Sequence, residues 1–200
     1  SYRRGRNMEE KKKFQIKDLI ITALMVLCSQ VLYRVLSFLF ISPYTMLLAV
    51  PIWSIIGAIA YFLVPVKTKN PWMILLFCVL TSIVSFYPPY MISCTVAGII
   101  AMLIAKTKGV SNYKGLTIGY VIFCVLAGFG GMCVPFLFYA DQTIKSYEKM
   151  FGSEYIETLT KLVSPMTTVI FLVVIAICAL IGAIISKKLL KKHFEKAGMI

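Results

Sequence analysis

Four polar or aromatic side chains share one face of an otherwise apolar stretch near the start of the chain. Gln30, Tyr33, Arg34 and Ser37 recur at spacings of three and four residues, which places them on one side of a helix. Lipid cannot satisfy such a stripe, so it must face protein or water. We expect Arg34 to line an outward-facing cavity, where it anchors an anionic group or pairs with Asp141. The simpler alternative is that its side chain snorkels to the membrane interface.

Aromatic residues are expected at the same level of the membrane as this stripe. The usual interpretation is an interfacial aromatic belt, and the alternative is a cavity wall that stacks on a flat ligand ring. Helix breakers at Pro51, in YPPY (87–90) and in AGFGGMCVP (127–135) favour the cavity, because they let backbones bend near its mouth. The candidate substrate-binding residues are Arg34, Gln30, Tyr33, Ser37, Trp53, Tyr87, Tyr90, Tyr139 and Asp141.

The apolar stretches lack the side chains that catalysis or ion coupling inside a membrane would need. They contain no Asp, Glu or Lys, and the single histidine, His193, lies in the basic tail. The chain has no GxxxxGKS/T motif for ATP, and its six cysteines form no CxxC pair. We therefore expect no enzyme activity, no metal site and no cofactor. Any uphill transport would need another subunit to supply the energy.

Long apolar blocks dominate the chain and set its class. Of the 200 residues 60% are hydrophobic and 14% are charged, against about a quarter charged in a typical soluble domain. A helix needs about 20 apolar residues to cross a bilayer core, and six blocks approach that length. The sequence predicts an all-α membrane protein, a compact bundle of six transmembrane helices in a single domain, 8–200. The approximate helices are 19–41, 46–66, 72–86, 91–105, 116–139 and 166–186.

Basic and near-neutral gaps alternate between these blocks. Gaps 42–45 and 87–90 carry no Lys or Arg, and in the long gap 140–164 four acidic residues outnumber three lysines. By the positive-inside rule both termini are expected in the cytoplasm. Apolar residues at helical spacing on both sides of Gly152 predict a short helical extracellular lid between helices 5 and 6. Ser164, followed by a proline, predicts the start of the last helix.

The ends of the chain are strongly basic. The net charge of +13 fits a cationic membrane protein that follows the positive-inside rule, so we expect lipid rather than nucleic acid as the partner of these charges. Residues 1–7 precede Met8 and read as a remnant of an expression tag. We expect no cleavable signal peptide, because the first apolar block is too long and no small-residue cleavage site follows it.

Several segments of the chain resemble a known family. YADQTIKSYEKMFGSEYIETL (139–159), a final helix and the tail SKKLLKKHFEKAGMI (186–200) are similar to the Trep_Strep, or MptD-like, family of substrate-binding S components of energy-coupling factor (ECF) transporters. The N-terminal KKFQIKDLIITAL (12–24) fits as well. The resemblance implies a multi-pass protein of the bacterial cytoplasmic membrane. Such a subunit captures a vitamin-like or other micronutrient from outside and delivers it inward with a transmembrane coupling subunit and two ATPase subunits.

The expected docking surface departs from the pattern of that family. Many S components carry AxxxA on the first helix, whereas here Ala23 is followed four residues later by Leu27. Thr22, Ala23 and Val26 would still offer a fairly smooth patch. Two other functions stay open from the residues alone. A membrane interaction or structural protein would have its outer cavity filled by side chains, and a self-sufficient facilitator would need a water path through the bundle.

Overall fold

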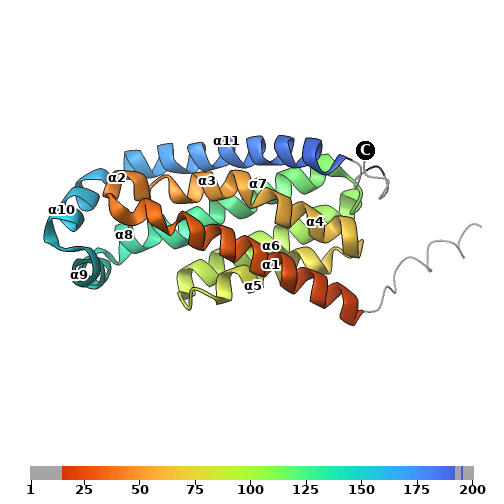
Figure 1. Cartoon of the computed structure of the whole chain (residues 1–200), viewed down its shortest axis with the longest axis horizontal. Helices are drawn as coiled ribbons and strands as arrows, with labels where there is room; N and C mark the ends of the chain where they lie inside the picture. Colours follow the sequence, from red (N-terminus) through yellow and green to blue (C-terminus); the bar gives the residue numbers. More distant parts are fainter. Residues whose placement is uncertain (1–14, 192–194, 196–200) are drawn as a thin grey trace, which may run out of the picture.

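The structure of the protein, a computed structural model, describes residues 15–191 and residue 195. Every regular element in these residues is helical, and the long helices run side by side in one bundle (Figure 1). The predicted tag remnant, 1–7, lies outside the described residues. The elements are α1 (Ile16–Val35), η1 (Leu36–Ile41), α2 (Pro43–Met46), α3 (Ala49–Ile56), α4 (Ala58–Thr68), α5 (Trp72–Ile83), α6 (Pro88–Lys108), α7 (Tyr113–Gly128), η2 (Phe129–Cys133), α8 (Val134–Phe138), α9 (Ala140–Phe151), α10 (Ser153–Leu162) and α11 (Pro165–Leu189).

Within the described residues, five stretches are long and apolar enough to cross a membrane. They are 16–41, 43–68, 88–108, 113–138 and 165–189. Helix α5 has 12 residues and is also apolar. At 1.5 Å per residue it is about 18 Å long, against a hydrocarbon core of about 30 Å. Length and composition therefore identify five spanning helices and one shorter apolar helix, where the sequence predicted six spans.

Three of the predicted helices are interrupted. The first ends in a 3-10 segment, η1, and the second divides into α2, α3 and α4. The fifth contains a π-helical turn, η2, whose sequence FGGMC carries two adjacent glycines. The prolines of YPPY, predicted to lie in a gap, instead form the first turn of α6, where a missing backbone N–H costs nothing. The last helix begins as predicted, with a capping box between Ser164 and Thr167.

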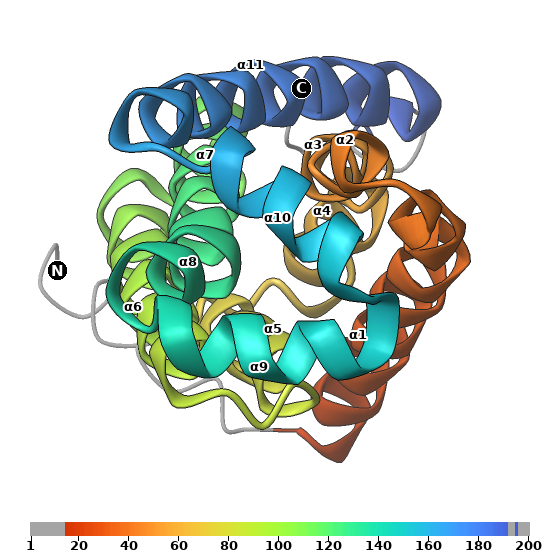
Figure 2. The ribbon, with the colours of Figure 1, turned by 90° about the vertical axis from the view of Figure 1, so that its left-hand side faces the viewer.

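The two ends of the bundle differ in charge and in covering. Helix α1 begins and α11 ends at the same end, where lysines gather in the connections and on α11 (Figure 1). The two short helices predicted for 140–164 are α9 and α10, and they lie across the opposite end (Figure 2). Gly152 joins them with a φ of +88°, a conformation that favours glycine.

The core lies in the half of the bundle nearer the lysine-rich end. Five aromatic side chains, each at most 1% exposed, fill its centre, and we call this region the packed half: Tyr61, Phe62, Phe77, Tyr120 and Phe123. The backbones also approach closely here. A Cβ added at Gly182 of α11 would come within 2.6 Å of the backbone oxygen of Ser54, so glycine is what allows α11 to lie against α3.

Candidate functional site

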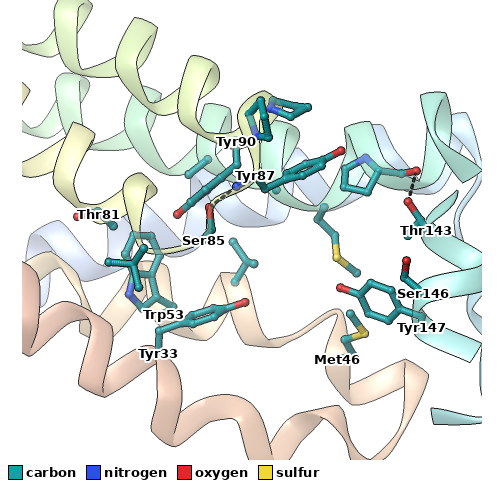
Figure 3. Close-up of a pocket in the computed structure, with 18 of the residues that line it drawn as sticks. Tyr33, Met46, Trp53, Thr81, Ser85, Tyr87, Tyr90, Thr143, Ser146 and Tyr147 are labelled. Atoms are coloured by element: carbon teal, nitrogen blue, oxygen red, sulfur yellow. Dashed lines mark hydrogen bonds between the residues drawn. The ribbon is translucent and has the colours of Figure 1, made fainter. Parts of the chain in front are cut away.

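A cavity of about 840 Å³ lies at the other end of the bundle, beneath α9. Its walls come from α1, α2 and α3 on one side and from α7, η2 and α8 on another. The turn between α5 and α6 and the inner face of α9 complete the lining (Figure 3). The site is therefore assembled from segments more than 100 residues apart in the sequence.

Seven of the nine residues expected to bind substrate line this cavity. They are Gln30, Tyr33, Arg34, Trp53, Tyr87, Tyr90 and Tyr139. The other two, Ser37 and Asp141, do not line it. Ser37 lies in η1 and is exposed, because a 3-10 segment has three residues per turn and the face of α1 does not continue through it. Asp141 is exposed at the start of α9, where it lines a separate shallow depression formed by 137–142.

Arg34 does not pair with Asp141. Within the described part of the chain the ion pairs are Lys161–Glu157 and Lys191–Glu195, both on the surface. Arg34 is exposed at the rim of the cavity, and among the described residues that line it Arg34 is the one that carries a charge. The pairing with Asp141, one of the alternatives left open by the sequence, is therefore wrong, and Arg34 gives this cavity a positive potential.

Two hydrogen bonds fix the floor of the cavity. The amide of Gln30 donates from Nε2 to the backbone oxygen of Thr81 at 2.9 Å, which ties α1 to α5. The indole of Trp53 donates from Nε1 to the backbone oxygen of Ser29 at 3.3 Å, which ties α3 to α1. The ring of Tyr33 meets Trp53 edge-on, with centroids 6.5 Å apart. These contacts hold the floor residues in place without a ligand.

Tyrosine hydroxyls point into the cavity from several sides. Tyr33 and Tyr147 approach the same space from α1 and α9 (Figure 3). The hydroxyl of Tyr87 is buried and has no hydrogen-bond partner among the described residues. Burial, with a smaller contribution from Tyr139, raises the pKa of Tyr87, and burial together with Tyr87 raises that of Tyr147. Both are neutral at physiological pH and can donate a hydrogen bond to a ligand.

The sequence did not predict the contribution of α9 or of two methionines. Gln142, Thr143, Ser146 and Tyr147 line the cavity from α9, and their spacing of three and four residues was the signal that could have found them. The hydroxyl of Thr143 donates to the backbone oxygen of Pro135 at 2.9 Å and so attaches α9 to α8. Apolar wall is added by Met46 and Met132, which are both buried.

The docking patch expected on α1 is only partly at the surface. Thr22 and Val26 are 0% and 5% exposed, because this face of α1 packs against α4 and α5. Thr22 donates from its hydroxyl to the backbone oxygen of Asp18 at 2.8 Å. Ala23 is exposed. The prediction is therefore wrong for Thr22 and Val26, and of the three only Ala23 is available to a partner.

The lining combines apolar faces, several hydroxyl donors and one cation, which suits the binding of a small neutral or anionic molecule. A family model described as a hypothetical bacterial integral membrane protein (Trep_Strep) matches residues 16–196. No curated protein and no solved structure matches the chain.

Proposed function

The chain belongs to the Trep_Strep family of bacterial integral membrane proteins, and from that premise we propose that it is the substrate-binding subunit, or S component, of an ECF-type importer. It captures a vitamin-like or other micronutrient at the cavity beneath α9. A separate transmembrane coupling subunit and two ATPase subunits supply the energy for delivery to the cytoplasm. The chain itself performs no covalent chemistry.

One observation carries this proposal, namely that the cavity is confined to one half of the bundle. It has room for a small organic molecule, since ligand sites are typically about 300–1,000 Å³, and its volume is about 840 Å³. Towards the lysine-rich end the packed half closes the path with Tyr61, Phe77 and Phe123. A cavity closed on one side suits a subunit that captures a solute and depends on partners to move it.

The topology of the proposal has six crossings. In addition to the five long stretches, the short helix α5 makes one crossing, the third in chain order. It packs between α1 and α6, which are both longer and extend beyond it. An even number of crossings leaves both ends of the chain on one side, and the positive-inside rule assigns that side to the cytoplasm because the lysines gather there. Helices α9 and α10 then form an extracellular lid, and the protein resides in the cytoplasmic membrane.

The observations weigh against the two other functions. An interaction or structural protein has no use for an open cavity, whereas here polar groups line a large one. A self-sufficient facilitator needs a water path, whereas the packed half is filled by aromatic rings with centroids 4.9 to 6.2 Å apart. Docking of the coupling subunit on α1 uses Ala23 and its exposed neighbours Leu24 and Leu27.

The test is to purify the chain in a mild detergent and analyse it by native mass spectrometry. We expect a small molecule bound in a one-to-one ratio, and co-purification of two ATPase subunits with a coupling subunit when the chain is tagged in its own cells. Absence of both a bound molecule and these partners would contradict the proposal. Partners without a bound molecule would keep the assembly but reject this cavity as the site.

A further inference from the structure

The exposed part of the cavity lining lies mainly on one side of the bundle. Nine of the lining residues are exposed. Six of them come from α1, from the α5–α6 turn with the start of α6, and from α9, and we call them the side mouth: Arg34, Val84, Ser85, Pro88, Gln142 and Ser146. Ile92 lies one turn further along α6, and the other two, Gly131 and Tyr139, lie in η2 and directly after α8. Deeper in the cavity the lining residues Met46, Trp53 and Met132 are each at most 9% exposed. The cavity therefore opens sideways, between α1 and α6.

The side mouth exists because α5 ends early. Helix α5 packs between α1 and α6. Gln30 of α1 is level with Thr81 of α5, since the two residues share a hydrogen bond. From that level α5 continues for two residues to Ile83, whereas α1 continues for five to Val35 and then into η1. Beyond Ile83 the chain forms a non-helical turn, 84–87, before α6 begins at Pro88.

Entry into the cavity along the bundle axis is blocked by α9 and α10, in contrast to entry through the side mouth. Helix α10 inserts Ile156 and Leu159, which are 4% and 0% exposed. Leu159 packs in a cluster with Met46, Met132 and Phe136. The hydroxyl of Tyr155 donates to the sulfur of Met46 at 3.3 Å. Figure 2 shows α9 and α10 lying across this end of the bundle.

Apolar surface borders the side mouth on both flanks. On α1 the exposed fractions of Val31 and Val35 are 61% and 63%, and on the other flank those of Phe86 and Ile92 are 84% and 65%. These side chains continue the apolar surface of the spanning helices up to the opening. Exposing such apolar side chains to water is unfavourable, whereas contact with lipid at the edge of a bilayer is favourable.

We propose that the ligand of this cavity is an amphiphile that passes through the side mouth from the surrounding membrane leaflet, rather than a solute that descends from water through α9 and α10. The inference rests on the proposed binding function and specifies its substrate class. An anionic or strongly polar head stays at Arg34, which lies at the mouth. The apolar body lies against Trp53, Met46 and Met132, deeper in the cavity.

Fluorescence quenching of Trp53 tests this route. The chain has two tryptophans, so Trp72→Phe leaves Trp53 as the only reporter, inside the cavity. The full-length variant is reconstituted in phosphatidylcholine vesicles. The membrane probe is a fatty acid with a nitroxide on its chain, which has a carboxylate head and an apolar body. The aqueous probe is a small water-soluble nitroxide carboxylate with the same charge.

Two matched pairs of substitutions control access. Val84→Phe with Ile92→Phe adds bulk at two positions that line the cavity on the mouth side. Ile83→Phe with Val96→Phe adds the same bulk at exposed positions that do not line it. We expect the labelled fatty acid to quench Trp53 saturably in the parent and in the control pair. The mouth-filling pair should abolish the saturable part, and the aqueous probe should quench little in any variant. The single changes Val84→Phe and Ile92→Phe serve if the pair does not insert.

Other results separate the two proposals. Saturable quenching by the fatty acid that survives mouth filling would overturn the side route. So would equal quenching by the aqueous probe in all variants, which would place the route through α9 and α10 and leave the binding function intact. If neither probe reaches Trp53 in any variant, both the side route and a ligand-accessible cavity are contradicted.

Discussion

The two halves of the bundle are built in different ways from the same kind of helix. In the packed half, aromatic rings and small residues fill the space between the helices. In the half with the cavity, the 3-10 segment η1, the π turn η2 and the early end of α5 all border open space. Each of these three irregularities shortens or bends a helix that would otherwise continue along the cavity.

This contrast indicates where stability and binding reside. Tight interior packing gives low energy and resists changes of volume. A cavity lacks those contacts, and π turns are frequent at functional sites. We therefore expect substitutions in the packed half to alter mainly the free energy of unfolding, and substitutions around the cavity to alter mainly ligand binding.

The largest expected effect on stability is in the packed half. Phe123→Ala removes a ring that is 0% exposed and contacts Trp53, Tyr61 and Phe77. We expect a loss of about 3–5 kcal/mol in the free energy of unfolding, measured by denaturant titration in mixed micelles. Phe40→Ala, at a half-buried residue of the cavity lining, should cost roughly half as much, because its ring already borders open space. Equal losses would remove the distinction between the halves.

Smaller changes in stability, of opposite sign, are expected when two glycines are replaced by alanine. Gly182→Ala should lower the free energy of unfolding by about 1–3 kcal/mol, since its added Cβ would meet backbone atoms that cannot move aside. Gly115→Ala is the matched change, because its added Cβ would meet ordinary contacts at 3.4 Å. In this variant the free energy of unfolding should rise by about 0.5–1 kcal/mol, because alanine favours a helix more than glycine does. Thermal unfolding in detergent measures both, and stabilisation by Gly182→Ala would show that α11 does not lie this close to α3.

The smallest effect concerns alkaline pH at the cavity. Burial and Tyr87 raise the pKa of Tyr147 above its ordinary value of 10.0, so the folded state favours the neutral phenol. Its contribution to stability is fully present below that value and is lost as the pH rises through the folded pKa. Tyr147→Phe should therefore lose less stability than the wild type above about pH 10. Tyr44→Phe, at an exposed tyrosine outside the cavity lining, is the control. If both variants lose stability as the wild type does, Tyr147 does not face the cavity as described.

Much of the helical pattern could be predicted from the sequence, because apolar length and capping residues are local signals. The start of α11 at Ser164 and the two short helices around Gly152 are examples. The stripe of Gln30, Tyr33 and Arg34 also reached the cavity as expected. These features depend only on helical spacing and on the cost of placing polar groups in lipid.

The rest depends on packing between distant segments. Ser37 left the predicted face because η1 changes the helical period, and 3-10 and α turns differ too little locally to be told apart in advance. Thr22 and Val26 were buried by α4 and α5, which the sequence of α1 does not reveal. The role of Tyr147 required knowledge of how α9 crosses the end of the bundle.

The most direct test of a ligand-binding cavity compares two substitutions that each remove one positive charge. Arg34→Ala removes the cation of the cavity lining, and Lys145→Ala removes an exposed cation of α9 that does not line it. Native mass spectrometry of the two purified variants gives the occupancy of the bound molecule. Thermal unfolding of the same samples reports the fold. We expect Arg34→Ala to lose the molecule while its unfolding temperature matches that of Lys145→Ala, which keeps it. Full occupancy in Arg34→Ala would contradict the assignment of Arg34 as the anchor of the site.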